Sequence, residues 1–416
     1  MADGHDMPSW LDEKFFENML RKREASNEIK IIDLSVTTGT AKSDHYASIM
    51  FRAKVKYMST PPNAITGVQK EQSMIIKTTP ITEGPKKEAF TKTKLFETEI
   101  GMYSETLPNF ERILMEHDDA TKLCAEMLYH SLEPHKCVIF EDLTINGYTT
   151  ITNGWCSLEE VKMGLLKLAK IHAISYKLHN EGDVSLSSYK YGSFNTMDIN
   201  EFNLTKNSIK LFKEVLQQYE DLQLYLPHVV KIEHSLHKGM YNLFDAYFRG
   251  DKTGIFVLTH GDLHMKNAMY KRDQFNKNKL GDVLLIDFQL SVFGSVAIDL
   301  FFFFVAFFSP DMRLNKRDEL FNYYFKNFRE TLEQLNFNGK VPTLLDLHME
   351  LKKHRHAEIF MFMTLTVMQH AFSTNEDIDR IFEDEVFRRS IQRRPEYLQE
   401  LRSLLPMYLH KGYFEP

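Results

Sequence analysis

Cysteine is scarce in this sequence. Only three cysteines occur among 416 residues, at Cys124, Cys137 and Cys156, and no two of them form a Cys-x-x-Cys pair. A sparse, odd number without such spacing argues against a disulfide framework and against a cysteine-ligated zinc site. We therefore expect thiols that serve as packing residues, in a protein of a reducing compartment.

A long apolar run and an excess of basic residues are also missing. The longest apolar run covers nine positions, 300–308, whereas a membrane-spanning helix needs about 20. The first residues contain no basic region followed by an apolar core, which a secretory signal would require. Acidic residues outnumber basic ones, 57 to 51, which gives no support for a nucleic-acid partner. We predict a cytoplasmic protein without a membrane span.

The sequence does have the composition of a globular protein, with 43% hydrophobic and 26% charged residues. Its N-terminal part is rich in β-branched and aromatic residues, often in alternation with polar ones. Strands are predicted over 29–36, 46–57, 72–78 and 136–140. Helices are predicted over 9–23, with Ser9 as the N-cap, and over 88–105, where Leu107-Pro108 would end the helix.

The remainder of the chain reads mostly as helix. Ser157 and Glu160 have the spacing of a capping box, which predicts a helix start at this point. Further helices are predicted at about 200–222, 229–248, 299–308, 315–336, 346–373 and 395–405. The change of character near 143–157 predicts two parts, a β-rich part over 1–142 and a helical part over 143–416.

The strongest chemical signal lies between Leu258 and Asp287. Asp262 and Asn267 stand five positions apart, and Asp287 follows the apolar run 283–286. The intervening sequence predicts a hairpin that returns Asp287 to the neighbourhood of Asn267. Phosphoryl transfer from ATP needs such a set, with Asp262 accepting the proton of a hydroxyl and Asn267 and Asp287 supplying oxygen ligands to magnesium.

Each of these residues alone also has an ordinary explanation. The His-Gly-Asp triplet can be a simple turn, and Asp287 can simply end a strand. An Asp and an Asn at this spacing arise often by chance, but all three residues joined by a hairpin favour phosphoryl transfer. Asp299 is expected to be the N-cap of the phenylalanine-rich helix, with a second role in bracing the catalytic loop.

Two further residues fit the binding of phosphates. Lys77 ends an apolar strand, from which a lysine can reach the α- and β-phosphates when a glutamate on the next helix holds it. Glu99 is the candidate partner, and Glu97 is the neighbour that could take its place. A strand-edge lysine and a solvated helix glutamate are the alternative, because most charged side chains simply face water.

The remaining candidates for nucleotide binding are weaker. The loop that contains Gly39 would cover the phosphates with Ser43 as a hydrogen-bond donor, although phosphate loops usually hold several glycines. Glu141-Asp142-Leu143 follows a predicted strand and would connect two lobes, so that its backbone groups could pair with an adenine edge. Glu141 and Leu143 are therefore predicted to lie at the nucleotide.

Taken together, these motifs resemble those of aminoglycoside phosphotransferases, choline kinases and, most closely, the ecdysteroid kinase-like family. The resemblance covers roughly residues 30–375. It is carried by His260-Gly261-Asp262 with Asn267, Asp287-Phe288-Gln289, Ile76-Lys77-Thr78, Phe96-x-x-Glu99-x-x-x-Tyr103, Glu141-Asp142-Leu143 and Leu168-Ala169-x-x-His172-Ala173.

The resemblance implies an α+β, protein-kinase-like fold with a small β-rich lobe, a large helical lobe and ATP between them. It also implies Mg²⁺-dependent phosphorylation of a small, hydrophobic alcohol such as an ecdysteroid, by a protein expected to be a monomer. One departure concerns the acceptor, because His264 stands where many relatives carry tryptophan. A catalytically silent, ligand-binding protein is the alternative, although the whole catalytic set is present. A protein kinase fits less well, because Gln289 replaces the glycine of Asp-Phe-Gly.

Overall fold

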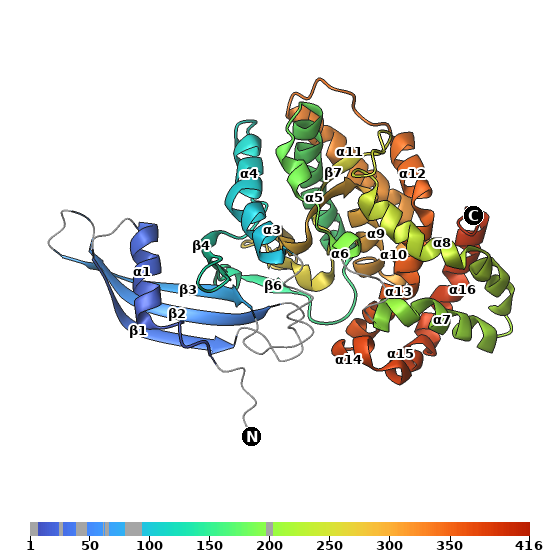
Figure 1. Cartoon of the computed structure of the whole chain (residues 1–416), viewed down its shortest axis with the longest axis horizontal. Coiled ribbons are helices and arrows are strands. Elements are labelled where there is room, and N and C mark those ends of the chain that lie inside the picture. The colour runs from blue at the N-terminus through green and yellow to red at the C-terminus, as the bar shows by residue number, and fades with distance from the viewer. Residues whose placement is uncertain are drawn as a thin grey trace. The chain divides into compact units, whose positions relative to one another are not determined.

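The computed structural model describes residues 7–24, 28–38, 48–60, 62, 66–79, 94–196 and 203–416. The chain forms two compact units. The first comprises Met1–Thr106 and Cys124–Tyr148, and the second comprises Leu107–Leu123 and Thr149–Pro416. The first unit is built on an antiparallel sheet and the second is mainly helical, so the chain is of the α+β class (Figure 1).

The sheet of the first unit has five strands in the order β1-β2-β3-β5-β4. Alternation explains its two faces, because every second residue of β2 from Ile49 to Tyr57 is buried. Helix α1 (Glu13–Glu24) packs its buried residues Phe16, Met19 and Leu20 into the same core as β2. The strands are β1 (Glu28–Thr38), β2 (Ile49–Thr60), β3 (Val68–Thr78), β4 (Met127–Ser131) and β5 (Cys137–Glu141).

The structure corrects two predicted helix ends. Helix α1 begins at Glu13, and its first turn is capped by Asp12, whose carboxylate accepts the N–H of Phe15 at 2.8 Å. The prediction of Ser9 as N-cap was therefore wrong. Pro108 does not end a helix, because residues 95–115 form one helical run, and Pro108 lies just after a π turn within it. Part of the predicted helix over 88–105 lies outside the described residues.

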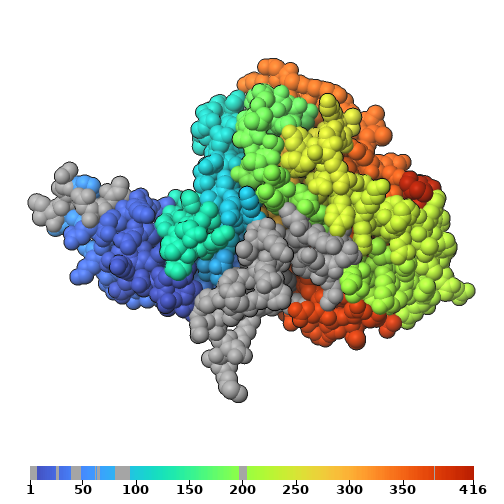
Figure 2. All heavy atoms as spheres, in the orientation of Figure 1, coloured from blue at the N-terminus to red at the C-terminus, as the bar shows by residue number. Residues whose placement is uncertain are grey.

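The elements of that region and of the second unit complete the fold. The helices are α3 (Leu95–Gly101), a π turn (Met102–Thr106), α4 (Leu107–Met115), α5 (Leu158–Asn180), α6 (Ser193–Thr196), α7 (Asn203–Gln218), α8 (Leu226–Asp245), α9 (Ala297–Ala306), α10 (Pro310–Asn315), α11 (Arg317–Gln334), α12 (Leu344–Lys353), α13 (Arg355–Ser373), α14 (Asp379–Glu383), α15 (Glu385–Gln392) and α16 (Pro395–His410). The strands are β6 (Tyr148–Thr150), β7 (Phe256–Thr259), β8 (Ala268–Arg272), β9 (Leu280–Leu285) and β10 (Val292–Ser295). In Figure 2, α7 and α8 appear in yellow-green on the surface of the second unit.

Two helices show how sequence directs the second unit. The capping box at the start of α5 is confirmed, because Ser157 accepts the N–H of Glu160 while Glu160 accepts the N–H of Ser157. Helix α9 carries the phenylalanine run, and all ten of its residues are buried, as expected of a core helix.

The predicted helix over 346–373 is divided at His354 into α12 and α13. Among the described residues, no helix is long and apolar enough to cross a membrane.

The cysteines lie in the packed interior. All three are buried and unbonded to one another. Burial raises the pKa of the Cys137 thiol to about 12 and raises that of Cys156 as well. The thiols of Cys137 and Cys156 therefore stay protonated and poorly nucleophilic, which fits the packing role expected from the sequence.

Candidate functional site

The loop that carries Asp262 leaves a short, fully buried strand. Strand β7 pairs in antiparallel fashion with β10, and Thr259 lies opposite Val292. The Thr259 hydroxyl adds a 2.8 Å hydrogen bond to the Val292 carbonyl. The backbone at the start of the catalytic loop, which we define as residues 260–267, is thereby fixed to the core.

A buried carboxylate holds the beginning of this loop. Asp299 is fully buried, and its two oxygens accept the N–H of His260 at 2.7 Å and the N–H of Gly261 at 2.9 Å. The ring of His172 lies 3.0 Å from the same carboxylate, and its other nitrogen lies 2.8 Å from the Tyr324 hydroxyl. Asp299 therefore braces the loop, with His172 and Tyr324 as its support.

The expected capping role of Asp299 was wrong. Helix α9 begins at Ala297 with Val296 at the N-cap position, so Asp299 lies within the first helical turn. A carboxylate is favourable there because of the positive end of the helix dipole. Its side chain is directed to the catalytic loop rather than to the end of its own helix.

Gly261 is required by the shape of this loop. Its φ is +80°, and a Cβ atom at this position would lie 2.1 Å from the Leu290 carbonyl oxygen. Backbone of this conformation is costly for residues with a side chain, and the carbonyl cannot move without disturbing the segment after Asp287.

We expect Gly261→Ala to lower the free energy of unfolding by about 2–4 kcal/mol, from backbone strain plus overpacking. Gly250→Ala is the matched control, because Gly250 has a φ of +82° but no atom within 4 Å of the position that a methyl group would take. The control should lose only about 1–2 kcal/mol, the cost of the left-handed backbone. Urea unfolding of both variants measures the difference, and equal losses would contradict the steric explanation.

The predicted hairpin brings the two proposed metal ligands to one place. Strands β8 and β9 pair with Ala268 opposite Leu285, and the Ile286 N–H donates to the Asn267 carbonyl at 2.9 Å. Asn267 and Asp287 are therefore next to each other across the end of the hairpin. Asp287 adopts a left-handed backbone with φ of +68°, and its carboxylate accepts the side-chain N–H of Gln289 at 3.3 Å.

Asn267 also connects to the loop. Its side-chain Nδ2 donates to the Asp262 carbonyl at 3.0 Å, which leaves its Oδ1 atom as the acceptor. The contact uses the backbone of Asp262, so the Asp262 carboxylate is not consumed by it. The second unit thus gathers Asp262, Asn267 and Asp287 on one loop and one hairpin.

The first unit holds the predicted lysine and glutamate as a buried pair. Lys77 Nζ lies 2.9 Å from Glu99 Oε1 and 2.8 Å from Oε2, with side chains 6% and 2% exposed. Glu97 instead accepts from Lys136 at 3.0 Å, so it is not the partner of Lys77. A lysine and a glutamate this far from water are retained at a cost in desolvation, which distinguishes them from the solvated charges of the alternative explanation.

The segment Glu141-Asp142-Leu143 is fixed by its own side chains. Asp142 accepts from Arg52 at 2.9 Å and from Ser73 at 2.7 Å, and it also caps the short helix that begins at Leu143. The side chain of Glu141 accepts the N–H of Glu126 at 2.8 Å and an N–H of Asn146 at 3.1 Å. The side chain of Glu141 therefore serves the local structure, and its backbone N–H donates to the Glu126 carbonyl at 3.0 Å. Ser43 and Gly39 lie outside the described residues.

Several of the residues that position the site carried no sequence signal for that role. His172 and Tyr324 act on the loop through Asp299. His172 is 127 residues from Asp299 in the sequence and 152 residues from Tyr324. Arg52 and Ser73 hold Asp142 across 90 and 69 residues. No short-range spacing could have predicted these contacts, since they depend on the tertiary fold.

Two histidines of the loop differ in their surroundings. His260 is buried, its ring lies 2.9 Å from the Ile286 carbonyl, and burial lowers its pKa while Asp299 opposes the change. His264 keeps 38% of its side chain exposed, and its Nε2 lies 3.8 Å from Asp262 Oδ2. The part of the ring that packs against the protein is desolvated, and this lowers the pKa of His264 to about 4, although the negative charge of Asp287 opposes the change. Both rings are therefore neutral at neutral pH.

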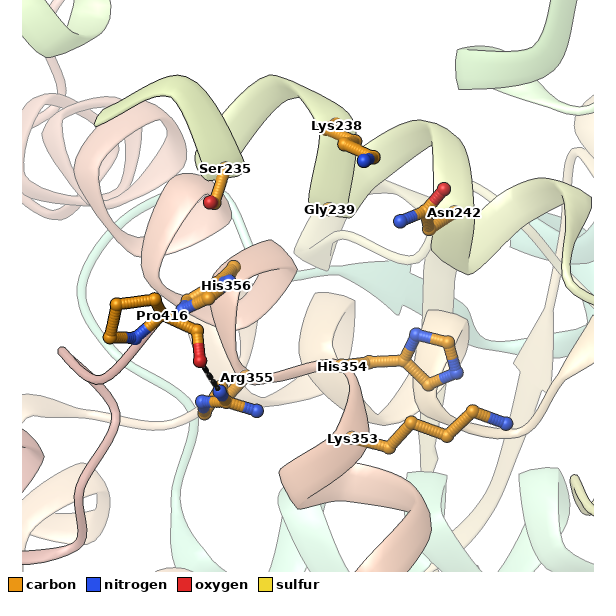
Figure 3. A pocket seen from close by; sticks show the side chains of 9 residues that line it. All are labelled: Ser235, Lys238, Gly239, Asn242, Lys353, His354, Arg355, His356 and Pro416. Carbon is orange, nitrogen blue, oxygen red and sulfur yellow. Dashed lines mark hydrogen bonds between the residues drawn. The ribbon is translucent and has the colours of Figure 1, made fainter. Parts of the chain in front are cut away.

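A separate cavity of about 270 Å³ lies elsewhere in the second unit (Figure 3). It is lined by Ser235, Lys238, Gly239 and Asn242 of α8, by Lys353 to His356 and by Pro416. Lys353 is paired with Asp251, and Arg355 donates to the carbonyls of Glu415 and Pro416. Since it shares no residue with the catalytic set and much of its charge is already paired, we assign it no part in the chemistry.

The fold and these residues define a class. An antiparallel sheet with a buried Lys–Glu pair, followed by a mainly helical unit with the Asp, Asn and Asp set, is the arrangement of a kinase-like two-lobe fold. The comparison with protein families agrees with this class. The chain belongs to the ecdysteroid kinase-like family, whose model matches residues 42–337. A search of curated proteins found no match.

Proposed function

We propose that this protein is an ATP- and Mg²⁺-dependent kinase that transfers the γ-phosphate to a hydroxyl of a small molecule. The family consists generally of phosphotransferases, which supports the reaction class. The observation that carries the proposal is the arrangement in the second unit. There, the side-chain N–H of Asn267 donates to the Asp262 carbonyl at 3.0 Å. The N–H of Ile286, the residue before Asp287, donates to the Asn267 carbonyl at 2.9 Å.

Each residue has a role in this proposal. Asp262 accepts a hydrogen bond from the acceptor hydroxyl, orients it and takes its proton as the new oxygen–phosphorus bond forms and the bond between the γ-phosphorus and the oxygen of the departing ADP breaks. Lys77, held by Glu99, binds phosphate oxygens. The backbone at Glu141 and Leu143 binds the adenine, and Ser43 is a further donor to the phosphates.

The donor set of Asn267 and Asp287 suits magnesium. An amide oxygen and a carboxylate are the hard ligands that Mg²⁺ prefers, and the donation by Asn267 Nδ2 leaves Oδ1 for such a use. When bound, the ion neutralises charge on the phosphate oxygens. The protein contributes by fixing both ligands on a rigid hairpin.

For the acceptor we propose a hydrophobic alcohol, with an ecdysteroid-like steroid as the first candidate. The family description supports this class, and the aromatic composition of the helical unit is compatible with it. The protein would be incubated with labelled ATP and a panel of ecdysteroids, sterols, choline and amino sugars. Transfer to a steroid alcohol is expected. No transfer to any acceptor, with wild type and Asp262→Asn equally inactive, would favour a kinase-shaped binding protein instead.

We expect Asp287→Asn to weaken the stabilisation that Mg²⁺ and a non-hydrolysable ATP analogue give to the wild type. A ligand at 100 times its Kd stabilises by about 2.7 kcal/mol, and a tenfold loss of affinity would remove about 1.4 kcal/mol of this. Asparagine keeps the shape and tolerates the left-handed backbone of this position.

Thermal unfolding with and without EDTA measures this effect. Asp118→Asn is the matched control, because Asp118 is an exposed aspartate of the second unit with a similar left-handed backbone, at a φ of +60°. The nucleotide alone, in EDTA, should stabilise the wild type and Asp287→Asn equally. If Asp287→Asn responds to Mg²⁺ like the wild type, Asp287 is not a metal ligand.

A further inference from the structure

His264 lies on the same side of the catalytic loop as Asp262. Its backbone is extended, with φ of −145° and ψ of 167°, and residues two apart in an extended segment point to the same side. Leu263, which stands between them, is fully buried, whereas the side chains of Asp262 and His264 are 27% and 38% exposed. The imidazole therefore faces the same solvent-accessible space as the catalytic carboxylate.

The ring of His264 has no evident part in holding the described residues together. Its Nε2 atom is 3.8 Å from Asp262 Oδ2, which is too far for a direct hydrogen bond. His264 precedes the short helix Met265–Asn267, but its side chain makes no capping hydrogen bond. By contrast, the rings of His172 and His260 both have close polar partners. Support of the fold therefore does not explain the imidazole of His264.

The ring has the chemistry to bind a hydroxyl. A neutral imidazole carries one hydrogen-bond donor and one acceptor. The Nε2 atom of His264 and the Oδ2 atom of Asp262 are 3.8 Å apart. Two oxygens on adjacent carbons of one molecule can therefore each form a hydrogen bond of normal length, one to each of these two atoms. A hydroxyl held by Asp262 would thus place a polar group of the next carbon within reach of His264.

We propose that His264 contacts the acceptor and favours molecules with a second hydrogen-bonding group on the carbon next to the reacting hydroxyl. This inference rests on the proposed function and adds the acceptor class, a vicinal diol.

The experiment compares two acceptors and three variants. The acceptors are a cholestanol and the cholestanediol with an additional hydroxyl on the adjacent carbon. The variants are His264→Leu, which removes the polar atoms, His264→Gln, which retains a donor and an acceptor, and His348→Leu, a half-buried histidine of α12 as the control. The readout is the ratio of kcat/KM for the diol to that for the mono-alcohol.

The wild type is expected to prefer the diol by about tenfold, the effect of one well-placed hydrogen bond. His264→Leu should lower this ratio to within about twofold of unity, while His264→Gln retains most of it and His348→Leu retains all of it. A wild type without preference, or a ratio unchanged in His264→Leu, would overturn the inference.

A binding measurement separates this inference from the proposed function. Thermal stabilisation by each alcohol is measured in the presence of Mg²⁺ and a non-hydrolysable ATP analogue. Greater stabilisation by the diol, lost in His264→Leu, supports the inference even if no phosphate is transferred. Transfer to both alcohols at the same rate in all variants would leave the kinase function in place and overturn only the role of His264.

Discussion

Asp262→Asn is expected to reduce phosphoryl transfer by about 10²- to 10⁴-fold, the usual contribution of a positioned general base. Asparagine has the same shape, but its amide cannot take the proton of the acceptor hydroxyl. Because Asn267 contacts the carbonyl of residue 262 rather than its side chain, the substitution leaves the proposed metal ligands in place. The variant therefore isolates the chemical role of the carboxylate.

The measurement combines turnover with binding. Transfer to the best acceptor of the panel is followed with labelled ATP, and stabilisation by Mg²⁺ and the ATP analogue is followed by thermal unfolding. The variant should bind the nucleotide like the wild type while transfer falls. A parallel loss of binding and transfer would assign Asp262 to nucleotide binding instead, and undiminished transfer would remove it from the mechanism.

The local parts of this site could be predicted from the sequence. Asp262, Asn267 and Asp287 are brought together by a short loop and a hairpin, whose alternation and polar turn are visible in the residues themselves. The pairing of Lys77 with Glu99 was also predictable, because a strand followed by a helix limits where the glutamate can lie. Such contacts span few elements, so pattern and spacing are sufficient to find them.

The supports of the site could be predicted only in part. Asp299 was expected to cap a helix and also to brace the catalytic loop. The bracing role is confirmed, because Asp299 accepts two backbone N–H groups 38 and 39 residues earlier, whereas the capping role was wrong. Asp299 has this role because the buried N–H groups of the catalytic loop need a hydrogen-bond acceptor, and helix propensity does not show that need. The break between α12 and α13 at His354 was missed for a related reason, since no proline or glycine marks it.

Asp299→Asn is therefore the prediction that tests the tertiary part of the site. The carboxylate accepts the N–H groups of His260 and Gly261 and contacts His172. Asparagine offers one acceptor oxygen, and its NH₂ group then faces a donor, so at least one buried N–H loses its partner. We expect the free energy of unfolding to fall by about 2–4 kcal/mol, from an unsatisfied buried group and the lost charge-assisted bonds.

Asp311→Asn is the matched control, because Asp311 is an exposed aspartate of α10 and its loss should cost less than about 0.5 kcal/mol. Chemical unfolding measures stability, and transfer of labelled phosphate measures the effect on the loop. Asp299→Asn should lose both stability and transfer, whereas Asp262→Asn should lose transfer alone. If Asp299→Asn were as stable and active as the control, the hydrogen bonds to His260 and Gly261 would not be what holds the catalytic loop. Loss of transfer alone in Asp262→Asn, and loss of both stability and transfer in Asp299→Asn, would thus distinguish the carboxylate that takes part in the reaction from the one that holds the catalytic loop.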